Sequence, residues 1–87
     1  MKQTVLLLSK LPEGERGYVS SVDRELRDTT DRLGLIPGTE ILCLRRSPLG
    51  SPIAYWFRST VLALRESTAA GIRIVQCSEE TNRVKKD

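Results

Sequence analysis

Short apolar or alternating runs, each bounded by Gly, Pro or charged residues, recur along the 87-residue chain. Residues 18–22 (YVSSV) and 72–76 (IRIVQ) alternate apolar and polar side chains, as half-buried strands do. The whole pattern predicts strands over residues 3–9, 18–22, 39–44, 53–59, 60–65 and 72–76. Because almost nothing separates the fourth run from the fifth, we expect these two to form a hairpin.

The alternation stops over residues 23–33, where the pattern predicts a short helix. Asp23 is a candidate N-cap residue for this helix, and Gly34 suits the left-handed position that follows a helix end. Residues 66–71 add one helical turn before the last strand. Two further segments, 36–38 and 45–52, are rich in turn residues, and Pro37-Gly38 has the order of a type II turn.

Short strands separated by turn signals are typical of a small barrel. We therefore expect an all-β fold with a short helix and one helical turn, a β-barrel of five to six strands. The barrel is expected over residues 1–77, and residues 78–87, which lack apolar periodicity, are expected to form a flexible C-terminal tail.

Composition fits one soluble domain with a single small core, since 39% of the residues are hydrophobic and 29% are charged. No apolar run approaches the length of a membrane span, and we expect the protein to be cytoplasmic. The net charge of +3 favours an acidic partner. Acidic residues are interspersed with the basic ones, which argues against the continuous basic stripe of a nucleic-acid-binding protein.

The chain has few residues suited to catalysis or metal binding. It contains no histidine, the commonest general base and transition-metal ligand. Its two cysteines, Cys43 and Cys77, lie far apart and belong to no CxxC motif. The acidic residues are scattered, and no Walker-type glycine loop is present. We expect no catalytic residue, no cofactor and no metal site, and thus no enzyme.

A binding role is better supported, and four residues around the second turn-rich segment are its candidates. Arg46 forms a basic pair with Arg45 just after a predicted strand, Leu49 is apolar at the tip of a Pro/Gly loop, and Ser51 and Tyr55 follow. Three of them have a purely structural alternative: solvated charge for Arg46, a side chain folded back over the barrel for Leu49, and a core position for Tyr55.

Four segments of the chain, in order and spacing, resemble the FeoA family: LPEGERGYV, GLIPGTEI, RRSPLGSPI and LALRESTAAGI. The resemblance runs from about Leu11 to Ile74 and is most specific over Leu33–Ile41 and Pro48–Ile53. One departure is Ser51, since family members usually read Gly-Asp-Pro where this chain reads Gly-Ser-Pro.

The resemblance implies an SH3-like β-barrel with a helix inserted between early strands. It also implies an accessory role in bacterial ferrous iron transport, through docking on the cytoplasmic GTP-binding region of the FeoB-type permease. The alternative is an SH3-like regulatory or nucleic-acid-binding module, related to the C-terminal domain of metal-dependent repressors. An exposed sheet edge would also allow weak pairing with a second copy of the chain.

Overall fold

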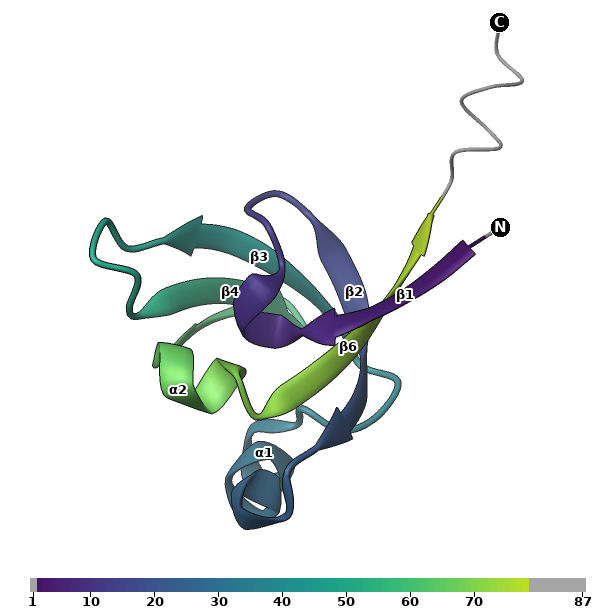
Figure 1. Cartoon of the computed structure of the whole chain (residues 1–87). Helices are drawn as coiled ribbons and strands as arrows, with labels where there is room; N and C mark the ends of the chain where they lie inside the picture. The colour runs from purple at the N-terminus through teal and green to yellow at the C-terminus, as the bar shows by residue number, and fades with distance from the viewer. Residues whose placement is uncertain (1, 79–87) are drawn as a thin grey trace, which may run out of the picture.

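The computed structural model describes residues 2–78, which form a six-stranded antiparallel sheet and short helical segments (Figure 1). The elements, with η for 3-10 helix, are β1 (Lys2–Leu7), η1 (Leu8–Lys10), β2 (Arg16–Val22), η2 (Arg24–Leu26), α1 (Arg27–Leu33), β3 (Glu40–Arg46), β4 (Ile53–Phe57), β5 (Thr60–Leu64), α2 (Glu66–Ala69) and β6 (Ile72–Ser78). The spatial order β1-β6-β2-β3-β4-β5 leaves β1 and β5 at the two edges. The predicted mostly-β class, with its six short strands, is confirmed.

The first and last strands of the described residues lie side by side, because β1 pairs with β6 from Lys2 opposite Ser78 to Leu7 opposite Arg73. Figure 1 shows the two strands projecting as a ribbon from the more compact part of the fold. Since β6 extends to Ser78, it passes the end of the predicted barrel by one residue. The rest of the predicted tail lies outside the described residues.

β1 ends two residues earlier than the sequence predicts, because residues 8–10 turn as a 3-10 helix. This turn folds the chain over the open side of the sheet and fully buries Leu8 and Leu11. They join a single core on the inner face of the sheet. Its other buried apolar members are Val19, Leu35, Ile41, Cys43, Ile53, Tyr55, Phe57, Leu64, Ala69, Ile72 and Ile74.

The helix forms where the sequence predicts it, and its C-terminal signal is confirmed. Gly34 adopts a left-handed φ of 88°, and the N–H of Leu35 bonds back to the carbonyl of Thr30 at 2.8 Å. Asp23 occupies the N-cap position of η2, as the sequence predicts, but its side chain makes no capping hydrogen bond. Its carboxylate pairs instead with the guanidinium of Arg73 across the sheet, at 3.0 Å.

The predicted corners are also present. Gly38 has a φ of 96° and the N–H of Thr39 reaches the carbonyl of Ile36 at 3.0 Å, as a type II turn requires. The β4–β5 hairpin turns through Arg58 and Ser59, which both take positive φ angles without a glycine. None of the helices within residues 2–78 is long and apolar enough to cross a membrane.

Candidate partner-binding site

The β3–β4 loop, residues 47–52, connects these two strands and carries two of the four candidate residues, Leu49 and Ser51. Arg46 and Ile53 are register partners at its base. Inside the loop the N–H of Gly50 bonds to the carbonyl of Ser47 at 2.8 Å, and Ser47 N–H bonds to the carbonyl of Pro52 at 3.2 Å. These bonds define a compact loop whose ends are held by the strands.

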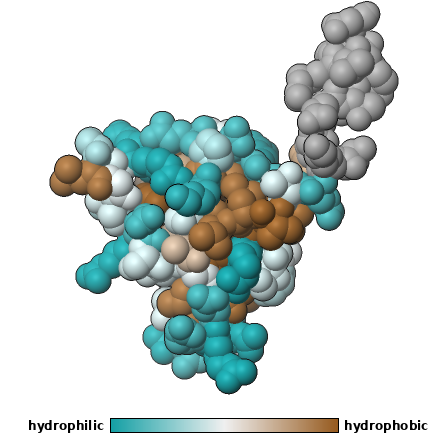
Figure 2. Space-filling model, in the orientation of Figure 1, coloured by the Kyte–Doolittle hydropathy of each residue, from teal (hydrophilic) through white to brown (hydrophobic). Residues whose placement is uncertain are grey.

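Leu49 stands at the tip of this loop, with 92% of its surface exposed. Its backbone N–H bonds to the hydroxyl of Ser47 at 3.3 Å, so the backbone beneath the side chain is anchored locally. Figure 2 shows the tip of the same loop as a hydrophobic knob set apart from the body of the protein. The side chain therefore points into solvent and does not fold back over the barrel.

Ser51 lies on the exposed side of the loop and braces it against α2. Its hydroxyl oxygen accepts a hydrogen bond from the backbone N–H of Glu66, the first residue of that helix, at 3.0 Å. An N–H in the first turn of a helix has no partner within the helix. The bond thus satisfies that donor and fixes the loop relative to the helical turn.

Arg46 turns inward, toward the segment that follows β1. Its guanidinium donates hydrogen bonds to the carbonyls of Leu11, at 3.0 Å, and of Ser9. Its backbone N–H donates to the carboxylate of Glu13 at 2.7 Å. The guanidinium therefore holds the covering segment, residues 8–11, against the end of β3. The side chain of the adjacent Arg45 is exposed.

Tyr55 was a candidate for partner binding, and the structure corrects this interpretation. Its side chain is fully buried and so is not part of the surface. Its hydroxyl donates a hydrogen bond to the carbonyl of Leu8 at 3.1 Å. Burial is the main reason that the pKa of this phenol lies above its ordinary value, and burial also raises the pKa of the neighbouring Cys43 thiol. Both groups are neutral core members at physiological pH.

No group of three or more metal-ligating side chains occurs within residues 2–78. Cys43 and Cys77 are both free thiols, the first buried and the second exposed. The chemistry available at the loop is therefore recognition: one exposed apolar side chain on a braced backbone beside an exposed arginine.

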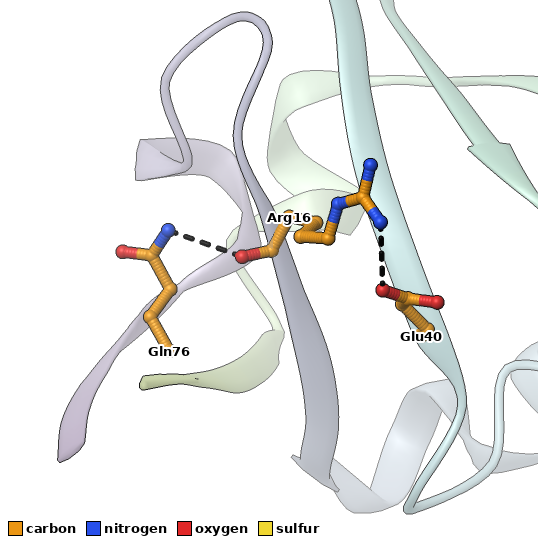
Figure 3. Close-up of polar contacts among 3 residues, drawn as sticks. All are labelled: Arg16, Glu40 and Gln76. Atoms are coloured by element: carbon orange, nitrogen blue, oxygen red, sulfur yellow. Dashed lines mark hydrogen bonds and ion pairs between the residues drawn. The ribbon is translucent and has the colours of Figure 1, made fainter. Parts of the chain in front are cut away.

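The sequence reasoning missed a second feature, a pocket of about 610 Å³ at the opposite ends of β3 and β4. Its lining residues are Arg16, Ile36, Pro37, Gly38, Thr39, Glu40, Leu42, Trp56, Phe57 and Arg58. Figure 3 shows Arg16 reaching from β2 toward Glu40 on β3, an ion pair of 3.3 Å, while Gln76 donates to the Arg16 carbonyl. No local sequence motif predicts this pocket, because its lining residues come from separate segments of the chain.

Comparison with known families gives one clear match: the FeoA domain family matches residues 6–76. No curated protein sequence matches the chain significantly.

Solved structures of FeoA proteins resemble this fold closely. FeoA from Chlorobium tepidum is 33% identical with a TM-score of 0.75, over 84% of this chain and 71% of that protein. The FeoA-like protein from Clostridium acetobutylicum is 28% identical with a TM-score of 0.75, covering 87% and 88%. Zinc-complexed FeoA from Stenotrophomonas maltophilia, described as a prokaryotic SH3 domain protein, is 25% identical with a TM-score of 0.71, covering 82% and 95%. The architecture is thus the SH3-like fold of these proteins.

A manganese-dependent transcriptional repressor shares the fold as well, with a TM-score of 0.76 over 88% of this chain and 44% of the repressor. Its sequence is only 18% identical, so this likeness extends to the fold alone.

Proposed function

The chain belongs to the FeoA family of non-enzymatic proteins associated with ferrous iron transport, and we propose that it docks on the cytoplasmic GTP-binding region of a FeoB-type permease. In this proposal the protein is cytoplasmic and supports or regulates uptake through contact with the permease. The family match over residues 6–76 supports the link to iron transport.

The observation that carries the proposal is the exposure of Leu49, at 92%, on the β3–β4 loop. An isolated apolar side chain in water contributes nothing to folding, but burying a leucine against a partner contributes about 1.5–3 kcal/mol. The same residue is therefore well suited to anchor an interface.

The way the loop is held adds to this argument. The hydrogen bonds from Gly50 to Ser47, and from Glu66 to Ser51, already fix the backbone around Leu49 in the free protein. A loop held in its binding conformation loses little conformational entropy on docking, so more of the contact energy appears as affinity. Ser51 thus acts in docking through the shape of the loop.

The charges beside the loop indicate what kind of surface would receive it. Arg45 is exposed next to the loop base, and the chain as a whole carries a net charge of +3. We expect a partner surface with an apolar depression for Leu49 and acidic groups near Arg45. Arg45 would then contribute more to the association rate and its salt dependence than to the final affinity.

The test is a titration of the ¹⁵N-labelled chain with the purified GTP-binding domain of the permease from the same organism. We expect saturable chemical-shift changes centred on residues 47–52. Replacing Leu49→Ser should weaken binding about tenfold or more, the equivalent of one buried apolar side chain. No change of shifts at a large excess of the domain would contradict docking.

A matched control is Val5→Thr, which alters another exposed apolar residue, 63% exposed, on β1. It should leave binding unchanged. Equal losses for the two variants would argue against the β3–β4 loop as the contact.

A parallel titration with a DNA duplex tests the nucleic-acid-binding alternative. We expect no binding at physiological salt. Binding to the duplex that weakens steeply as the salt concentration rises would instead favour that alternative.

A further inference from the structure

The pocket at the other end of β3 and β4 combines an apolar floor with a cationic rim. Leu42 and Trp56 are register partners on the outer face of the sheet, and the pocket is closed on one side by the Ile36-Pro37 turn. Trp56 is 42% exposed and Ile36 is 44% exposed, although both are large apolar side chains. The volume of about 610 Å³ falls within the range of about 300–1,000 Å³ that is usual for ligand pockets.

Arg58 supplies the cation on one side of the rim. The β4–β5 turn places this side chain over the end of α1, where its Nη1 donates a hydrogen bond of 3.3 Å to the carbonyl of Gly34. A guanidinium has five N–H donors, and this bond uses one of them. Within residues 2–78 no acidic side chain forms an ion pair with Arg58, which is exposed and lines the pocket.

The opposite side of the rim is neutral as a whole, because Arg16 pairs with Glu40 at 3.3 Å (Figure 3). The lining therefore holds two arginines and one glutamate, a net charge of +1 that is concentrated on Arg58. A guanidinium can bind a carboxylate through two parallel hydrogen bonds. An aromatic and aliphatic floor next to it accepts one bulky apolar side chain.

From this arrangement we propose that the pocket binds an acidic segment of a partner protein, in which a carboxylate stands next to a bulky apolar side chain. The apolar side chain packs on Trp56 and Leu42, and the carboxylate bonds to Arg58. The site is separate from the β3–β4 loop, because β3 and β4 run between the two. The chain thereby presents two binding surfaces at opposite ends of one strand pair, and this second site does not depend on the proposed docking to the permease.

The chain carries its own reporter for a test, because Trp56 is its one tryptophan. The probes are acetylated and amidated peptides of the form Glu-X-Glu-Glu, with X as Leu, Phe or Val, added to the intact protein. We expect a saturable change in tryptophan emission with a dissociation constant between about 10 μM and 1 mM. A matched Lys-X-Lys-Lys series should give no saturable change.

Two substitutions at Arg58 separate charge from fold. Arg58→Asn suits the positive φ of the turn and removes the cation, so it should weaken binding about tenfold; Arg58→Lys retains charge and should keep part of the affinity. Circular dichroism checks that both variants fold. Leu49→Ser should bind the acidic peptides normally, so a failure of permease docking and a failure of this site give different results.

Three outcomes would overturn the proposal. The first is no saturable emission change with any acidic peptide at about 5 mM, a concentration above the weakest affinity expected. The second is equal binding by the wild type and Arg58→Asn. The third is a concentration-dependent emission change in the protein alone, matched by dimerisation in sedimentation, which would show that a second copy occupies the pocket.

Discussion

The hydroxyl of Tyr55 donates a hydrogen bond to the carbonyl of Leu8, which lies 3.1 Å away and 47 residues earlier in the chain. Tyr55 belongs to β4, whereas Leu8 begins the 3-10 turn after β1. Since β1 and β4 are not neighbours in the sheet, this bond ties the covering turn to a strand that it does not pair with. It helps to close the fold over its core.

Replacing Tyr55→Phe removes this bond and leaves the buried carbonyl of Leu8 with one donor, the backbone N–H of Leu11 at 3.1 Å. We expect the free energy of unfolding at pH 7 to fall by about 0.5–1.5 kcal/mol, the net contribution of one hydrogen bond, as measured by urea denaturation. The exposed Tyr18→Phe is the matched control, and its stability at pH 7 should equal that of the wild type. An unchanged Tyr55→Phe variant would contradict a stabilising role for the bond.

The same substitution changes how stability depends on pH. Burial raises the pKa of Tyr55 in the folded protein, whereas in the unfolded chain it returns to about 10. The protonated phenol therefore contributes stability that is fully present below about pH 10 and is lost as the pH rises toward the folded pKa. We expect wild-type stability to fall more steeply above pH 10 than that of Tyr55→Phe. Part of the decline should persist in the variant, because the pKa of buried Cys43 is raised as well.

Arg46 clamps the same covering segment, and replacing Arg46→Met keeps much of its stem but removes the guanidinium. The carbonyls of Ser9 and Leu11 then lose a charged donor, so we expect a loss of about 2–3 kcal/mol in the free energy of unfolding. The free energy of unfolding of Arg46→Lys should lie between that of the wild type and that of Arg46→Met. The neighbouring exposed Arg45→Met should change stability by less than about 0.5 kcal/mol, and an equal loss at the two arginines would refute the clamp.

Gly17 lies where β2 passes close to β6. A β-carbon there would stand 2.9 Å from Cδ1 of Ile74 and 3.0 Å from the backbone oxygen of Val75, and the backbone cannot move aside as a side-chain tip can. Gly17→Ala should therefore cost about 1–3 kcal/mol and lower the Tm. The comparison is Ser20→Ala, an exposed change on the same strand, which should leave the Tm unchanged. Equal Tm values for the two variants would contradict this account.

Ser51→Ala removes the acceptor for the first N–H of α2. We expect a loss of about 1 kcal/mol, typical of a lost helix-end hydrogen bond, and increased mobility of the β3–β4 loop in ¹⁵N relaxation. Ser67→Ala, an exposed change inside the same helix, should affect neither quantity. If Ser51→Ala left the loop as rigid as before, the brace between Ser51 and α2 would carry no weight in the proposed docking.

The sequence by itself determined the parts of the fold that depend on neighbouring residues. The alternating run of residues 72–76, the Pro37-Gly38 turn and the Gly34 helix end all appear in the structure at those positions. Each is governed by the φ preferences of glycine and proline or by the two-residue period of a strand, and both act over a few residues. The same local turn chemistry places Leu49 at the tip of a loop, but whether its side chain is exposed or folded back was decided only by the tertiary structure.

Tertiary structure alone decided which way the long side chains point. Arg46 and Tyr55 both turn toward a segment that is at least 35 residues earlier in the chain, and no local pattern records that contact. The same holds for Asp23, which lies at the N-cap position of η2 but whose carboxylate pairs with Arg73 on β6. The pocket at Trp56 likewise requires β2, the Ile36-Pro37 turn, β3 and the end of β4 to be brought together. Packing sets these relationships, because burial and hydrogen bonding between distant segments outweigh the preferences of single residues.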